Sequence, residues 1–406
     1  MVSRFLVRCS GCGRRLILRI QVAAGLDPLV PTGAQPFLFA CPACRTGMRG
    51  RLLASGPAPN LHGEDFEVLE GKEASDDFVV TVATDVPVHR SLSGSLAGEA
   101  LLTPFIQLSS TIGPPAVGEL MSSVGRARGL RERAFPHVRR ATSSYVLADA
   151  VGVRRAIAAA VGAPDPTGSR VDPGELLRVT FAEMYAPIES SAAVALAAAE
   201  AARVVADARA ADPAAVSALL ADLNAGPYPE HRRRVFDTAI AALEDVEALS
   251  PAMWAEAMAG KVGLDDYRVM RDDFDLIKIR YQDIFEVGSR SLAVVSRFAN
   301  IARRGDVRQH ADGIGRSLKK AVNGTRAIDR EPWLVDFPEA TQLYLAVERN
   351  TRNDIGHTLV RYDFERGLLV YDDGATENYI EFLVDYLNAV RLTRYLVEVV
   401  LLLDHS

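Results

Sequence analysis

The sequence predicts a mainly helical protein that begins with a small β-rich ribbon and ends with a helical bundle carrying a β-hairpin. Three observations predict this fold class. All cysteines lie in the first 44 residues, in two C-x2-C pairs flanked by short strand-like runs. From about residue 95 onward, apolar residues recur at helical spacing. Near the C-terminus, two β-like runs precede a long helical pattern.

The cysteine pairs are Cys9-Ser-Gly-Cys12 and Cys41-Pro-Ala-Cys44. Zn²⁺ prefers four tetrahedral thiolates, and each C-x2-C turn presents two sulfurs on one side of an ion. The four cysteines therefore predict a zinc ribbon that holds one structural Zn²⁺ per chain, with no open coordination position. The alternative is two disulfides. It is disfavoured because no signal peptide is recognised at the N-terminus and the rest of the chain contains no cysteine.

The order of local signals predicts four consecutive regions. Residues 1–56 form the ribbon, and 57–94 form a linker with a short β segment at 78–83. Residues 95–260 form a helical middle domain, and 261–406 form a helical C-terminal domain. Strands are expected at 5–7, 16–22, 37–40, 358–362 and 368–371, and helices at 190–211, 265–302 and 376–403.

Charge is unevenly distributed along the chain. Residues 1–51 contain eight arginines and one aspartate, a net charge of +7, so the remainder carries −13 of the total of −6. This basic segment predicts phosphate contacts by Arg14, Arg15 and Arg19. A second basic stretch runs from 126 to 155. The alternative is codon supply in a GC-rich genome, because the chain holds many arginines, few lysines and much alanine.

No segment is long and apolar enough to predict a membrane span. The longest apolar run near the C-terminus, 397–403, is interrupted by Glu398. We therefore expect a cytoplasmic protein without membrane contact.

The polar segment after the apolar stripe of Leu343, Tyr344 and Val347 carries the pattern Arg352-Asn353-x3-His357. This pattern resembles the R-x4-6-H motif of HEPN-domain ribonucleases, in the form with Asn after Arg. Two other Arg–His spacings in the chain also fit the motif, so the spacing alone is not selective. The Asn and the position after a helical stripe favour the 352–357 pattern. The resemblance covers about the last 140 residues.

The resemblance implies a metal-independent endoribonuclease in which two motifs face each other across a homodimer. His357 suits the general base that takes the 2′-OH proton, because its unperturbed pKa lies near neutrality. Arg352 supplies a permanent charge for the phosphorane, and Asn353 orients either partner. Arg349 is a candidate second phosphate contact. By the same resemblance the protein is a toxin or phage-defence effector that acts on RNA, with a neutralising or triggering protein as a further partner.

Other interpretations of the same residues stay open. The 352–357 pattern also fits a structural turn, in a non-catalytic module whose ribbon binds nucleic acid or protein and whose bundle only dimerises. A zinc-ribbon transcription factor is disfavoured by the long acidic helical remainder and the lack of a second DNA-reading motif. A carboxylate metal site around Glu348 and Asp354 is also disfavoured, because acidic residues in turns are usually solvated.

Overall fold

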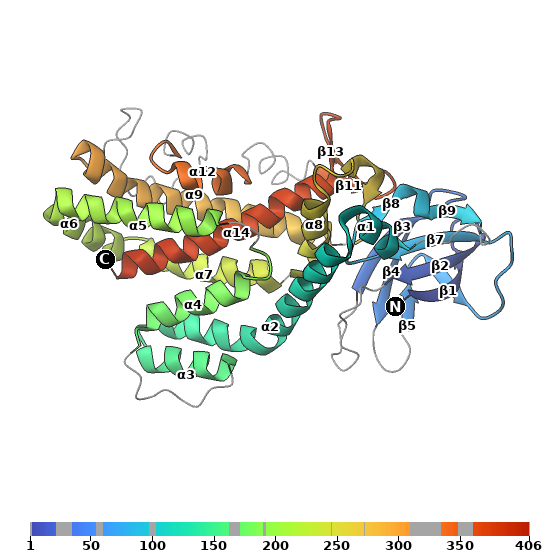
Figure 1. The fold of residues 1–406 in the computed structure, drawn as a ribbon, viewed down its shortest axis with the longest axis horizontal. Helices are drawn as coiled ribbons and strands as arrows, with labels where there is room; N and C mark the ends of the chain where they lie inside the picture. Colours follow the sequence, from blue (N-terminus) through green and yellow to red (C-terminus); the bar gives the residue numbers. More distant parts are fainter. Residues whose placement is uncertain are drawn as a thin grey trace. The chain divides into compact units, whose positions relative to one another are not determined.

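The computed structural model describes residues 2–21, 35–53, 60–96, 103–161, 171–189, 192–244, 246–271, 273–308, 334–347 and 360–405. The structure is mostly helical, with small β-sheets near the N-terminus, which confirms the predicted fold class at this level (Figure 1). The predicted HEPN arrangement of the C-terminal helices stays a prediction.

Contacts divide the chain into two compact units, and each collects three separate ranges. The first unit comprises residues 1–126, 246–278 and 357–387. The second unit comprises residues 127–245, 279–356 and 388–406. The four consecutive domains expected from the sequence stay a prediction, but segments far apart in the sequence fold together within each unit.

The first unit contains a five-stranded sheet with the order β6-β1-β2-β7-β9. Its strands are β1 (Val2–Cys9), β2 (Arg15–Gln21), β6 (Phe66–Leu69), β7 (Phe78–Ala83) and β9 (Ser93–Leu96). Strand β2 pairs in parallel with β7, whereas the other neighbours are antiparallel. Strands β1, β2 and β7 thus fall at predicted positions, and β2 and β7 are buried along most of their lengths.

A second sheet joins β3 (Gln35–Ala40), β4 (Gly47–Leu53) and β5 (Asn60–Gly63) in antiparallel order. The two sheets meet through aromatic rings. Phe66 on β6 lies with its ring centroid 6.4 Å from that of Phe37 and 5.8 Å from that of Phe39, both on β3. All three side chains are buried, so the ribbon strands share one apolar core.

The predicted hairpin is confirmed and gains a third strand. It consists of β11 (Val360–Asp363), β12 (Leu368–Tyr371) and β13 (Thr376–Asn378). Tyr362 on β11 packs against Phe274 and Tyr379, with ring centroids 6.3 and 4.3 Å away. These rings attach the hairpin to the first turns of α9 (Phe274–Arg304) and α14 (Tyr379–Asp404).

The remaining elements of the first unit are short. They are β8 (Val88–His89), η1 (Arg90–Leu92), α1 (Pro104–Ile112), α8 (Val246–Met258), η2 (Leu264–Asp266) and β10 (Tyr267–Arg268). The helix expected to begin at residue 265 begins instead at Phe274. Tyr267 and Arg268 extend as a strand because they pair with His89 and Val88, a contact between segments far apart in the sequence.

Helices make up the described part of the second unit. Besides parts of α2 (Pro114–Val146), α9 and α14, they are α3 (Ala150–Val161), α4 (Pro173–Tyr185), α5 (Ala193–Ala211), α6 (Pro213–Ala225), α7 (Tyr228–Glu244) and α12 (Pro338–Leu345). Helix α14 confirms the helix expected at 376–403, and it is buried on nearly all sides. In the described parts of the chain, none of the helices has both the length and the apolar character of a membrane span.

Candidate metal centre

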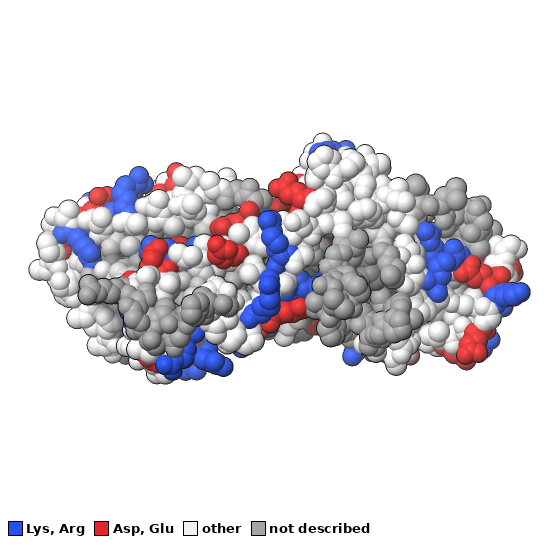
Figure 2. Space-filling model, turned by 60° about the horizontal axis from the view of Figure 1, so that its bottom comes forward, with Lys and Arg blue, Asp and Glu red and all other residues white. Residues whose placement is uncertain are grey.

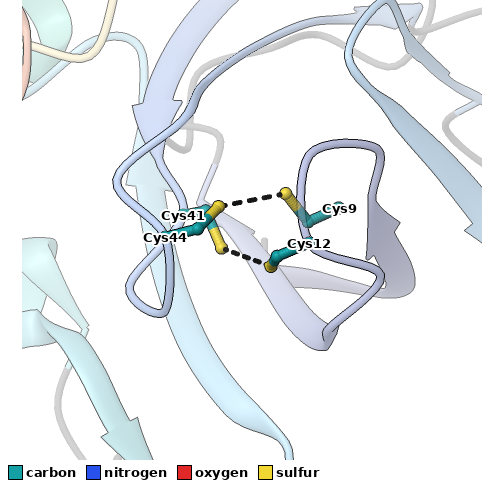
Figure 3. A group of neighbouring side chains, drawn as sticks. All are labelled: Cys9, Cys12, Cys41 and Cys44. Atoms are coloured by element: carbon teal, nitrogen blue, oxygen red, sulfur yellow. Dashed lines mark hydrogen bonds between the residues drawn. The ribbon is translucent and has the colours of Figure 1, made fainter.

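The four cysteine sulfurs converge from two β-hairpins (Figure 3). Cys9 and Cys12 lie at the turn between β1 and β2, and Cys41 and Cys44 lie at the turn between β3 and β4. Cys9 Sγ is 3.7 Å from Cys44 Sγ, and Cys12 Sγ is 3.8 Å from Cys41 Sγ. All four sulfurs lie within 4.8 Å of one another.

These distances match the geometry that a tetrahedral metal ion requires. With Zn–S bonds of about 2.3 Å, neighbouring sulfurs of a regular tetrahedron lie about 3.8 Å apart. A disulfide would bring two sulfurs to about 2.05 Å, and all four cysteines are free in this structure. The four thiols are therefore placed to hold a metal ion such as zinc, and the disulfide alternative has no geometric support.

The two turns that carry the cysteines share one backbone pattern, and we call them knuckle 1 (residues 9–14) and knuckle 2 (residues 41–46). In knuckle 1 the N–H of Cys9 donates to the carbonyl of Arg14, and the N–H of Gly13 donates to the carbonyl of Cys9. In knuckle 2 the N–H of Cys41 donates to the carbonyl of Thr46, and the N–H of Arg45 donates to the carbonyl of Cys41, both at 2.9 Å. Each hairpin thus presents its two sulfurs in the same way, as a ribbon with one pair per hairpin requires.

The residue after the second cysteine is left-handed in both knuckles, with φ of 71° at Gly13 and 62° at Arg45. Glycine adopts this conformation freely, whereas a residue with a Cβ does so at a cost of about 1 kcal/mol. The knuckles also approach each other closely. A Cβ added at Gly11 would lie 2.7 Å from Thr46 Oγ1, so only glycine fits there without movement.

Burial and hydrogen bonds act in opposite directions on the sulfurs. Burial raises the pKa of the Cys9 and Cys41 thiols, although backbone amides within each knuckle oppose that rise. The hydroxyl and the backbone amide of Thr46 lower the pKa of the more exposed Cys44 to about 6. A bound cation would supply the positive charge that the buried sulfurs need as thiolates, and its binding would release their protons.

The three arginines predicted to contact phosphate have different environments. Arg14 is exposed, and its guanidinium lies 5.6 Å from the centroid of the Phe78 ring. Arg15 donates to the carbonyl of Lys72 at 2.7 Å and pairs with the buried carboxylate of Asp77 at 3.1 Å. Arg19 is buried, and burial lowers its pKa. Their role in phosphate binding stays a prediction.

Other arginines near the N-terminus pair with carboxylates. The pairs are Arg4–Glu73, Arg8–Glu67, Arg45–Glu365 and Arg51–Glu64. In the stretch 126–155, Arg128 is buried and Arg139 pairs with Glu244. Figure 2 shows basic and acidic side chains next to one another in several places on the face drawn. Much of the local positive charge predicted from the sequence is thus matched by nearby acids.

The residues of the motif, Arg349, Arg352, Asn353 and His357, lie outside the described residues, which end at Val347 and resume at Val360. Sequence reasoning missed a different feature, the contact of knuckle 2 with the turn of the C-terminal hairpin. Arg45 and Glu365 are separated by more than 300 residues, so no local pattern indicates their pairing. Comparisons with protein-family models, curated proteins and solved structures found no match.

Proposed function

We propose that this protein is a cytoplasmic, metal-independent endoribonuclease of the HEPN type, stabilised by one structural Zn²⁺ per chain and acting as a homodimer. The observation that carries the proposal is the pattern Arg352-Asn353-x3-His357 in the segment between α12 and β11. As a biological class we propose a toxin or phage-defence effector, held in check or triggered by another protein.

The proposed reaction uses the nucleophile that RNA itself carries. His357 takes the proton of a 2′-OH, and the 2′-oxygen attacks the adjacent phosphorus. The P–O5′ bond breaks, the 5′-oxygen takes a proton from solvent, and a 2′,3′-cyclic phosphate remains. Arg352 holds the phosphate oxygens as negative charge builds on them, and Asn353 fixes the orientation of the pair. DNA lacks the 2′-OH and is not cut.

The described residues on both sides of the motif support the proposal. On the N-terminal side, Tyr281 Oη donates to the carbonyl of Ala346 at 3.2 Å and holds the end of α12. On the C-terminal side, Tyr362 Oη donates to the carbonyl of Val269 at 2.5 Å and holds β11. Each end of the segment is thus held within its own unit, and a general base and a charge clamp act only when they are well positioned.

The metal centre supports a division of labour between scaffold and chemistry. Four thiolates fill the tetrahedral positions around Zn²⁺ and leave none for water or substrate. A zinc ion held in this way stabilises the first unit and takes no part in cleavage, so the reaction is left to the motif. In this proposal Arg349 and the arginines of the ribbon, Arg14 foremost, contact RNA phosphates.

A non-catalytic binding module is the second candidate. The observation that favours it is the pairing of many N-terminal arginines with carboxylates, which suits a protein partner better than a phosphate backbone. The two candidates differ in one outcome, because only the enzyme cleaves RNA. Toxicity on expression that is relieved by His357→Ala likewise fits only the enzyme.

The test is cleavage of single-stranded RNA by the purified zinc-loaded protein without added metal. We expect cyclic-phosphate ends, no cleavage of matched DNA, and activity that persists in EDTA over times shorter than zinc release. His357→Ala and Arg352→Ala should each lower the rate by at least about 10²-fold.

Two exposed residues of the first unit serve as matched controls. His62→Ala and Arg361→Ala remove the same side-chain types on β5 and β11 and should leave the rate unchanged. Cleavage that survives His357→Ala, or that requires Mg²⁺, would exclude this mechanism. Absence of cleavage by a folded, zinc-loaded dimer would favour the binding module.

A further inference from the structure

Knuckle 2 contacts the turn of the C-terminal hairpin, which we define as residues 363–367. The ring of Phe364 lies against Gly47, at the start of β4 and directly after knuckle 2. A Cβ added at Gly47 would lie 2.4 Å from Phe364 Cζ, so the absence of a side chain there makes room for the ring. Arg45, whose side chain is largely exposed, pairs with Glu365 at 3.0 Å. One apolar and one ionic contact therefore join the knuckle to the hairpin.

The hairpin turn is itself held from its other sides. Arg90 donates to the carbonyl of Arg366 at 2.5 Å, and the N–H of Arg366 donates to Asp363 Oδ1 at 3.1 Å. At Gly367, where φ is 66°, a Cβ would lie 3.0 Å from the Cβ of Arg268, so the turn packs closely on β10. The turn is thus held against Arg90 and β10 as well as against the knuckle.

The same support reaches the strand that leads into knuckle 2. The N–H of Leu38 on β3 donates to the carbonyl of Met270 at 3.0 Å, and the neighbouring carbonyl of Val269 accepts from Tyr362 of the hairpin. The segment 267–270 therefore connects to both β3 and β11. The knuckle and the hairpin are fixed to one frame as well as to each other.

The conformation of Arg45 is a second, independent indication that its side chain is used. Gly13 occupies the equivalent left-handed position of knuckle 1 without strain, whereas knuckle 2 keeps an arginine there. Strained positions persist where the surrounding structure uses the residue. The contact that the Arg45 side chain makes is the ion pair with Glu365, across to the hairpin.

We propose that Phe364 and Glu365 stabilise the metal centre by contacting knuckle 2 and the start of β4 without binding the metal themselves. Metal binding and docking of the hairpin turn then stabilise each other. The hairpin holds Cys41 and Cys44 in the geometry that the metal needs, which slows metal loss. Coupling between two sites is reciprocal, so the bound metal in turn holds the hairpin on the knuckle. Groups behind the ligands of a metal commonly have this effect on its retention.

One consequence rests on the proposed function. Strand β11 begins three residues after His357, so loss of the metal would loosen the chain next to the proposed catalytic base. The metal ion would then influence the nuclease without contacting RNA itself. The coupling itself does not depend on this step, and its test uses no RNA.

The first arm of the test measures how fast the full-length, zinc-loaded protein loses zinc to excess EDTA. At set times the chelator is removed together with the zinc it has bound. The zinc that remains on the protein is then measured with a chromogenic indicator after denaturation. Phe364→Ala and Glu365→Gln should release zinc at least about tenfold faster than the wild type. Arg45→Ala, which removes the ion pair and keeps a side chain at the left-handed position, should also release zinc faster. Arg361→Ala on the same hairpin should match the wild type.

The second arm measures hydrogen exchange in the wild type with and without zinc. Zinc removal should increase exchange in residues 360–371 and leave α12, in the second unit, unchanged. The proposal would be overturned if Phe364→Ala and Glu365→Gln both released zinc at the wild-type rate. It would also be overturned if hydrogen exchange in residues 360–371 were the same with and without zinc. Failure to cleave RNA would remove the proposed function and leave both arms intact.

Discussion

His231 on α7 is a neutral histidine in the core of the second unit. It is almost fully buried, and its Nε2 lies 2.9 Å from the hydroxyl of Ser291. Burial, together with the positive charges of Arg290 and Arg234, lowers its pKa to about 3. The sequence offered no partner for this residue, since Ser291 lies 60 positions away.

This burial predicts a loss of stability in mild acid. In the unfolded chain His231 has a pKa of about 6.5, so between about pH 6.5 and 3 the unfolded state binds one more proton than the folded state. The contribution of His231 to the free energy of unfolding is therefore fully present above about pH 6.5. It falls by about 1.4 kcal/mol per pH unit as the pH is lowered from there. Denaturant unfolding at pH 7.5, 6.5, 5.5 and 5.0 measures this slope.

Two variants isolate the contribution of His231. His231→Gln keeps a group that can reach Ser291 but does not titrate, so its free energy of unfolding should fall less steeply below pH 6.5. His62→Gln changes an exposed histidine and should keep the wild-type slope. Parallel curves for the wild type and His231→Gln would contradict the prediction.

The N-terminal arginines show why the site was only partly predictable at this scale. The C-x2-C spacing alone predicts the metal centre, because two turns supply the four sulfurs. The charge environment depends instead on strand pairing: β6 lies beside β1 and brings Glu67 opposite Arg8. Asp77, just before β7, reaches Arg15 in the same way. Counting charges along the chain does not reveal these partners.

At the scale of elements, a carboxylate from another helix caps α12. The first residue outside this helix, Phe337, has no side chain that can cap it. Glu200 on α5 accepts hydrogen bonds from the N–H groups of Glu339 and Ala340, at 3.0 and 3.3 Å. A negative group at a helix N-terminus satisfies free amides and interacts favourably with the helix dipole.

Removal of this cap should loosen α12. Glu200→Ala leaves two amides at the helix start without an acceptor, at a cost of about 1–3 kcal/mol. Glu200→Gln keeps an oxygen acceptor and should cost less. Hydrogen exchange in residues 338–345 and the unfolding midpoint measure both effects. The control is Arg203→Ala, because the Arg203 guanidinium is exposed and lies 3.9 Å from the Glu200 carboxylate. Unchanged protection of α12 in Glu200→Ala would contradict the assigned role.

Elements with local signals were predicted better than those set by distant contacts. The alanine-rich run predicts α5, and the continuous β-like run of 78–83 predicts β7. The predicted start of α9, at residue 265, was wrong because Tyr267 and Arg268 pair with β8. The contact of Phe364 with Gly47 has no local signal either. The role of the 352–357 motif stays a prediction.

At the scale of the whole molecule, the ribbon is part of a larger unit. Strands β1 and β2 pair with β6 and β7, and β4 pairs with β5. The aromatic contacts of Phe66 with Phe37 and Phe39 join the two sheets. Loss of metal should therefore affect more of the first unit than the residues around the cysteines.

Metal removal gives the last prediction. The purified chain should contain one Zn²⁺, measured by metal analysis, and Cys41→Ser should contain little or none, because three thiolates leave the tetrahedron open. Without the metal, knuckle 2 loses what binds it to knuckle 1, so limited proteolysis should cut within both sheets, between residues 2 and 96. Far-UV circular dichroism should change little, because most helices belong to the second unit, whose apolar core contains no cysteine.

The control for this prediction is Leu147→Ser, an exposed position on the second unit, which should keep zinc and the wild-type cleavage pattern. A purified chain without zinc, or one with disulfides in fresh non-reduced samples, would contradict the metal centre. Cuts confined to residues 1–53, with none in β5, β6, β7 or β9, would show that the ribbon strands unfold independently of the strands they pair with.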